Sequence, residues 1–170
     1  MKRTLTLIRH AKSSWDDPDI SDFERTLNKR GQHDAPRIGA RLKQELDYQG
    51  ITFDKILCSA ATRARETLDC LQPALKIDAD NILYLQDLYC ASTQELLDVI
   101  EDHATGANHL AIIAHNPGLE NLASHLTGKT FSMSTCEAIQ IEFFDVTDWN
   151  QISVSKGTVL LDLYPKKLDD

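Results

Sequence analysis

Short apolar runs alternate with longer amphipathic stretches along the chain, and each kind of stretch predicts one type of element. The apolar runs are rich in β-branched residues or leucine, as in buried strands; they cover residues 4–8, 54–58, 82–85 and 110–114. In the other stretches apolar side chains recur at helical spacing; these cover residues 27–48, 59–75, 92–100 and 119–126. The alternation predicts an α/β fold, a three-layer α/β/α sandwich with a mainly parallel sheet covered on both faces.

The end of the chain and several helix boundaries carry further signals. Three more segments have strand-like patterns: residues 138–144, 151–155 and 158–164. Pro36 lacks an N–H and crowds the preceding turn, so the first helix should kink or restart there. Gly50 should end that helix. Ser92 and Glu95 form a capping-box pattern, which predicts the start of the third helix.

Composition narrows the class of protein. A chain of 170 residues that is 42% hydrophobic can build one core, so we expect a single domain over residues 1–170. A net charge of -8 argues against partners such as nucleic acid or an anionic membrane. The four cysteines lie far apart without a CxxC pair, which favours a reducing cytoplasm. The five uncharged residues before Arg9 are too few for a signal peptide or a membrane span.

Basic side chains follow three of the expected strands. Arg9 and His10 come directly after the first strand, Arg63 lies a few residues past the second, and His115 follows the strand at 110–114. Ligand sites of such sheets lie outside the carboxyl ends of the strands, so these groups should converge. Two arginines suit the charge of a phosphoryl group, and an imidazole beside them should stay neutral and nucleophilic. His115 and the helix start at Asn116 can bind the same anion.

Four segments of the chain make the pattern specific. They cover residues 7–13 (LIRHAKS), 24–31 (ERTLNKRG), 59–67 (SAATRARET) and 114–117 (AHNP). In this order they resemble the histidine phosphatase superfamily, and particularly its small phosphohistidine phosphatase branch, of which SixA is the named example. The sequence departs from the superfamily pattern at Ala11, where glycine is usual, and at Thr26, where proline is usual.

The resemblance implies a phosphoglycerate-mutase-like fold and a phosphohistidine intermediate on His10. Arg9, Arg63 and His115 would hold the phosphoryl group. Larger members carry a glutamate proton donor in a segment that residues 85–89 (LQDLY) only partly resemble, so Asp87 is a tentative general acid and equally a surface carboxylate. A phosphoramidate is easier to cleave than an alkyl ester, so a weak acid suits a phosphohistidine substrate.

The expected activity is that of a metal-independent phosphatase that needs no cofactor. We expect phosphohistidine in a protein as the substrate, because a chain of this length leaves little room for a lid over small molecules. Two alternatives stay open: hydrolysis of a small phosphate ester, and a non-catalytic phosphate-binding module. Arg25 either touches the phosphate indirectly or pairs with Asp22 or Glu24. The remaining histidines lack metal-ligand spacing; they are His33, His103, His109 and His125.

Overall fold

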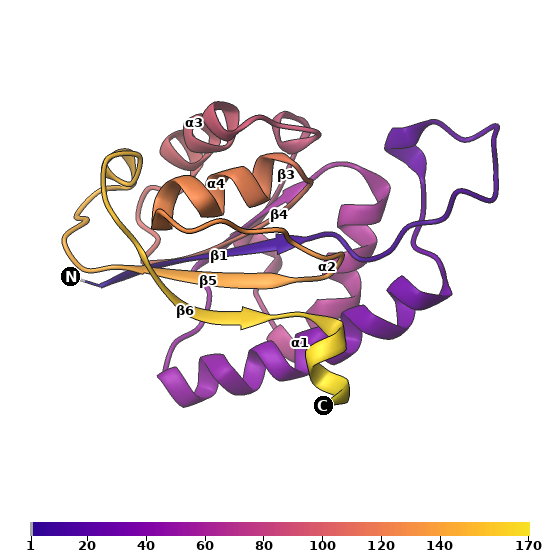
Figure 1. Ribbon diagram of the computed structural model, residues 1–170, viewed down its shortest axis with the longest axis horizontal. Coiled ribbons are helices and arrows are strands. Elements are labelled where there is room, and N and C mark those ends of the chain that lie inside the picture. Colours follow the sequence, from indigo (N-terminus) through magenta and orange to yellow (C-terminus); the bar gives the residue numbers. More distant parts are fainter. Residues whose placement is uncertain (1) are drawn as a thin grey trace.

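The computed structural model describes residues 2–170 and has a six-stranded sheet at its centre (Figure 1). Across the sheet the strands are β3 (Ile82–Leu85), β2 (Lys55–Ser59), β4 (His109–Ala114), β1 (Arg3–Arg9), β5 (Ala138–Phe143) and β6 (Thr158–Leu163). The first four of these strands are mutually parallel. β5 runs antiparallel to β1, and β6 runs antiparallel to β5. The sheet is therefore mixed but mainly parallel, as the sequence predicts.

Two helices cover each face of this sheet (Figure 1). They are α1 (Lys29–Gln49) and α2 (Thr62–Leu75) on one face, and α3 (Thr93–His103) and α4 (Gly118–Thr127) on the other. Side chains of a strand point alternately to the two faces, and β4 follows this rule. Leu110 and Ile112 pack with α3 and α4, whereas Ala111 and Ile113 pack with α1 and α2. This arrangement confirms the three-layer α/β/α sandwich.

Short 3-10 helices complete the chain. They cover Asp22–Glu24, Ala79–Asn81, Gln86–Leu88, Trp149–Gln151 and Pro165–Asp169. The strand predicted over residues 151–155 is therefore wrong. Trp149 and Ile152 are buried in the layer that holds α3 and α4, three residues apart as a helical turn requires, so the apolar residues there belong to a turn. No helix within residues 2–170 has the length and apolar character needed to cross a membrane.

The helix boundaries agree with the sequence in most places. The Ser92–Glu95 capping box is present at the start of α3, and Gly50 ends α1 in the left-handed conformation with φ +70°. α1 continues through Pro36, so the expected restart does not occur. Residues on both sides of the proline, such as Ala35 and Ile38, are fully buried in one apolar cluster, and this packing holds the helix together.

The start of α1 packs tightly on the segment that follows β1. The Asn28 side chain accepts the N–H of Gly31 at 2.9 Å, and the backbone N–H of Asn28 donates to the carbonyl of Lys12 at 3.0 Å. A Cβ at Gly31 would lie 2.2 Å from that carbonyl oxygen. Only glycine therefore lets the helix approach this segment so closely.

We expect Gly31→Ala to lower the free energy of unfolding by about 1–3 kcal/mol, because the methyl group overpacks a backbone contact. Urea denaturation measures the change. Gln32→Ala is the matched control, since Gln32 is exposed on the same turn and should unfold like the wild type. If Gly31→Ala and Gln32→Ala have the same free energy of unfolding, the backbone contact accommodates the methyl group without loss of stability.

Candidate active site

The basic residues expected at strand ends lie in one pocket at the carboxyl edge of the sheet. Arg9 ends β1 beside Ala114 of β4, so His10 and His115, which follow them, are neighbours. Their ring centroids are 5.1 Å apart. The pocket has a volume of about 210 Å³ and is lined by Arg9, His10, Lys12, Ser13, Trp15, Arg25, Arg63, Cys90, His115, Asn116 and Thr135. The expected convergence of these groups is thus present.

One hydrogen bond sets the tautomer of His10. Its Nδ1 lies 2.8 Å from the carbonyl oxygen of Ala11, and because a carbonyl only accepts, Nδ1 carries the hydrogen. Nε2 is then unprotonated and accepts the Nε–H of Arg63 at 3.3 Å. Burial, with smaller contributions from the charges of Arg63 and Arg9, lowers the pKa of His10 to about 4. Neighbouring charges, the cause expected from the sequence, contribute less than burial does.

Arg63 lies in the first turn of α2 and is almost fully buried. Its Nη1 donates to the backbone carbonyl of Asp22 at 2.6 Å, and its Nη2 donates to Asp22 Oδ2 at 3.2 Å. Together with the bond from Nε to His10, these contacts engage all three nitrogens of the guanidinium. Arg63 therefore has a fixed orientation beside the unprotonated nitrogen of His10.

Arg9 also lines the pocket. Its Nη1 donates to the carbonyl of Met133 at 2.9 Å, and its buried Nε has no hydrogen-bond partner among residues 2–170. Burial is the main cause that lowers the pKa of Arg9, but an arginine keeps its charge at any physiological pH. Arg9 thus retains a donor for an anion.

His115 is oriented by the last residue of β2. Its Nε2 lies 2.7 Å from the hydroxyl oxygen of Ser59, which also accepts the N–H of Ala61 at 3.3 Å. Ser59 can either donate its own hydrogen to Nε2 or accept one from it, and the first arrangement leaves the ring hydrogen on Nδ1. Nδ1 has no partner in the described chain, so in that tautomer it is a free donor. Burial is the main cause that lowers the pKa of His115 to about 3, and the electrostatic effects of His10 and Arg63 lower it further.

The Asn116 side chain lines the pocket but uses its donors elsewhere. Its Nδ2 donates to Glu120 Oε2 at 2.9 Å and to the carbonyl of Met133 at 3.0 Å. The same carbonyl accepts from Arg9, so Asn116 supports the wall on which Arg9 rests. Binding of an anion by the Asn116 side chain remains a prediction, and these contacts do not favour it.

Asp87 is not among the residues that line this pocket. It is exposed in the 3-10 helix Gln86–Leu88 and lines a neighbouring pocket of about 400 Å³. That pocket also contains Glu95, Asp98 and Asp102, and it shares Cys90 with the pocket of His10. The structure therefore brings together four of the expected catalytic residues and leaves the tentative general acid outside.

Arg25 forms the ion pair with Asp22 that the sequence offered as one alternative, and its contact with a phosphate stays a prediction. Its Nε pairs with Asp22 Oδ1 at 3.1 Å, and its side chain also lines the pocket. Nη1 donates to Ser13 Oγ at 2.5 Å, and the guanidinium stacks over the exposed Trp15 ring at 3.5 Å. Sequence reasoning missed Ser59, although it occupies a strand end as Arg9 does.

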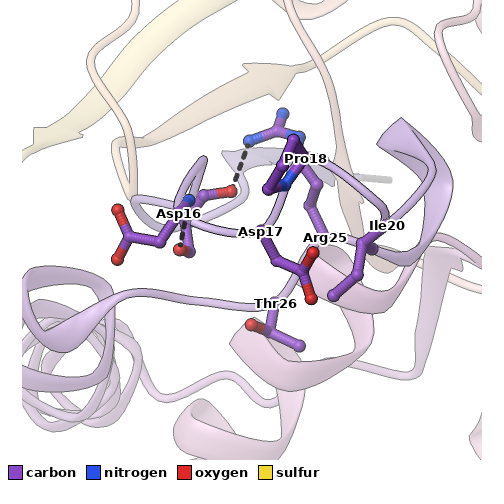
Figure 2. Close-up of a pocket in the computed structure, with 7 residues that line it drawn as sticks. Asp16, Asp17, Pro18, Ile20, Arg25 and Thr26 are labelled. Atoms are coloured by element: carbon purple, nitrogen blue, oxygen red, sulfur yellow. Dashed lines mark hydrogen bonds between the residues drawn. The ribbon is translucent and has the colours of Figure 1, made fainter.

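Beyond Arg25 the loop from Ser14 to Thr26 encloses a second cavity of about 360 Å³ (Figure 2). Asp16, Asp17 and Ile20 lie around it, and the carbonyl of Ser14 accepts from Arg25 Nη1 at 3.3 Å. The acidic residues of this loop are exposed, as expected for a turn.

The geometry fits the chemistry of a phosphoryl group. The buried guanidinium of Arg63, the partly buried guanidinium of Arg9 and the neutral imidazole of His115 line one pocket with the unprotonated nitrogen of His10, and the side chains that line it include no carboxylate within residues 2–170. An oxyanion is therefore stabilised beside a nucleophile. The described chain contains no cluster of three or more His, Cys, Asp or Glu side chains suited to a metal ion.

The His10 tautomer gives a direct prediction. The ring should keep a protonated Nδ1 and an unprotonated Nε2 from pH 8 down to pH ~5, because burial disfavours the imidazolium and holds the pKa near 4. Nitrogen-15 NMR of the histidine rings measures both nitrogens. Titration of His10 near pH ~6.5, the ordinary histidine value, would contradict this assignment.

Comparison with known proteins identifies the family of the chain. A model of the histidine phosphatase superfamily (branch 1) matches residues 5–89, which include Arg9, His10 and Arg63. The uncharacterized chloroplastic protein At3g52155 of Arabidopsis thaliana is 32% identical over 92% of this chain and 73% of its own. The SixA homologue of Agrobacterium tumefaciens is 25% identical, with a TM-score of 0.78 over 96% of this chain and 98% of its own. The protein histidine phosphatase SixA complexed with tungstate is 21% identical, with a TM-score of 0.77 over 97% and 99% of the two chains. The chain belongs to the histidine phosphatase superfamily, and its fold is that of the SixA-like, phosphoglycerate-mutase-like members.

Proposed function

We propose that this protein removes the phosphoryl group from phosphohistidine in a protein, through a phosphohistidine intermediate on His10. The observation that carries the proposal is the unprotonated Nε2 of His10, which is buried next to Arg63 and in one pocket with Arg9 and His115. The likeness to SixA proteins supports this choice of substrate class.

The reaction has two transfers at one phosphorus atom. The Nε2 lone pair of His10 attacks phosphorus, and the leaving group departs with the electron pair of its bond. Arg9, Arg63 and His115 donate to the three oxygens of the transferring group, whose charge spreads over them in the transition state. The Ala11 carbonyl keeps the hydrogen on Nδ1 and stabilises the positive ring that forms. Water then displaces His10, which recovers its electron pair, and both protons of the water leave with the product as H2PO4⁻.

The leaving group decides between the phosphohistidine and phosphate-ester alternatives. An alkoxide needs a proton as it leaves, and the lining of the described pocket offers no carboxylic acid. The imidazole of phosphohistidine leaves as a neutral molecule when its other nitrogen is protonated, so it needs no acid from the enzyme. Asp87 accordingly transfers no proton in this reaction. Turnover of substrate would distinguish the protein from a non-catalytic phosphate-binding module.

Metal independence and a cytoplasmic location are part of the proposal. Arg9 and Arg63 already offset the roughly two negative charges of the phosphoryl group, so the transfer does not call for a cation. The cysteines are free thiols at Cys58, Cys70, Cys90 and Cys136, as a reducing compartment maintains them.

With EDTA present, kcat/KM should be about 100-fold higher for a phosphohistidine protein than for an alkyl phosphate, because the site supplies no proton to an alkoxide. Para-nitrophenyl phosphate, which has a good leaving group, should also be hydrolysed, and vanadate should inhibit as a transition-state mimic. An assay of phosphate release measures the two kcat/KM values, the hydrolysis of para-nitrophenyl phosphate and the inhibition by vanadate. A higher kcat/KM for the alkyl phosphate would favour the small-molecule phosphatase, and activity lost to EDTA and restored by Mg²⁺ would contradict metal independence.

The covalent intermediate gives the second prediction. Rapid acid-free quenching with a radiolabelled substrate should trap label that survives alkali, is lost in acid, and maps to the peptide containing His10. His10→Ala should trap none and lose turnover, whereas His115→Ala should keep weak labelling because it removes a stabilising donor and leaves the nucleophile. His33→Ala, on the exposed start of α1, is the matched control and should label fully. Acid-stable label on a serine or cysteine would contradict the mechanism.

A further inference from the structure

Asp22 is the centre of a hydrogen-bond network that the reaction described above does not use. Its Oδ2 accepts from the hydroxyl of Tyr89 at 2.5 Å and from Arg63 Nη2 at 3.2 Å. Its Oδ1 accepts from Arg25 Nε at 3.1 Å, and its backbone carbonyl accepts from Arg63 Nη1 at 2.6 Å. Asp22 belongs to an exposed loop, yet side chains from three different parts of the chain hold it in place.

The Tyr89 ring packs against Phe23, while its hydroxyl donates to Asp22. The two rings meet edge to face with centroids 5.0 Å apart, and the Tyr89 ring also meets the His115 ring at 5.5 Å. The loop that carries Asp22 is thus packed against a ring that touches the site itself. Such support fixes the position of the Asp22 carboxylate relative to His115 and Arg63.

The contacts of Asp22 define which edge of Arg63 remains for a phosphoryl group. A guanidinium has five N–H groups in one plane, and two of them, one on each Nη, point to Asp22. The Nε–H points to His10 Nε2, where the phosphorus is attacked. With its outer edge held at two points, the plane cannot rotate, and the Nε edge stays directed at the reacting atoms.

We propose that Asp22 is a positioning residue that clamps the Arg63 guanidinium so that its Nε edge faces His10 and the transferring phosphoryl group. The inference rests on the proposed phosphoryl transfer at His10. Asp22 does not act as a general acid, because its carboxylate accepts three hydrogen bonds and has no proton to give. The Tyr89 hydroxyl, followed by the positive charge of Arg63, holds the pKa of Asp22 at about 2 in agreement with this role.

A double-mutant cycle tests the clamp. Asp22→Asn places an amide where donors of Tyr89, Arg63 and Arg25 converge, so it should lower kcat/KM for para-nitrophenyl phosphate about tenfold by releasing Arg63. Arg63→Ala should lower it about 100- to 1000-fold, and adding Asp22→Asn to that variant should change it less than about twofold, since Asp22 has nothing left to position. Equal losses in both backgrounds would overturn the proposal.

Asp16→Asn is the matched control, because it removes the same charge from the same loop. The Asp16 carboxylate has no hydrogen bond to the residues of the His10 pocket, and it lies beside the second cavity (Figure 2). Its kcat/KM should equal that of the wild type. A loss as large as that of Asp22→Asn would assign the effect to loop charge and overturn the clamp.

A series of aryl phosphates separates positioning from acid catalysis. If Asp22 positions Arg63, the loss in Asp22→Asn should be the same for leaving groups of low and high pKa. A loss that grows with the leaving-group pKa would make Asp22 a proton donor and would contradict the proposal.

Hydrogen exchange gives a readout that does not depend on turnover. The Arg63 Nε–H should exchange slowly in the wild type and in Asp16→Asn, and about tenfold faster in Asp22→Asn because the released guanidinium opens to water. NMR of the arginine Nε–H groups measures the rate. Unchanged exchange in Asp22→Asn would overturn the clamp. Absence of any phosphatase activity in the wild type would contradict the proposed function, and the exchange rates would still decide whether Asp22 holds Arg63.

Discussion

The parallel pairing of β1 with β4 is the constraint on which the site depends. The register from Thr4 opposite His109 to Arg9 opposite Ala114 makes both strands end at one edge of the sheet. Since β2 pairs with the other side of β4, its last residue, Ser59, reaches the same edge, and α2 begins nearby. Backbone hydrogen bonds at the centre of the fold thus bring together His10, its cationic partners and the residue that orients His115. The loops add support to groups that the sheet has already placed.

Burial and positive charge act on the same imidazole in the same direction. Both disfavour a charged His10, and burial is the larger cause, so its Nε2 stays unprotonated even before an anion arrives. In the proposed reaction the same arginines would also stabilise the transferring oxygens. The negative charge of a bound phosphoryl group would offset the arginines and so lower the cost of the positive ring that forms on His10.

The sequence predicted what the strands determine and missed what the loops determine. Arg9, His10 and His115 follow apolar runs whose ends parallel pairing must bring together, so their convergence was accessible from spacing alone. The loop of Asp22 has no apolar period, and its partner Tyr89 lies 67 residues away, so no local pattern could reveal their contact. The role of general acid for Asp87 rests on the family resemblance alone, and the residue lies in the 3-10 helix Gln86–Leu88, where it lines the neighbouring pocket. Residues 151–155 resembled a strand because two buried side chains of a turn supplied apolar residues at short spacing.

The charge distribution links the site to the size of its substrate. The chain carries a net charge of -8, while the pocket lining contains arginine and lysine without a carboxylate in the described chain. The cavities on either side are acidic, with Asp16 and Asp17 around one and Asp87, Glu95, Asp98 and Asp102 around the other. At physiological salt the field of an exposed charge decays over about 8 Å, so the positive pocket attracts an anion only at close range. A phosphoryl group on a protein can arrive with cationic neighbours that face these carboxylates, which supports the phosphorylated protein proposed above as the substrate.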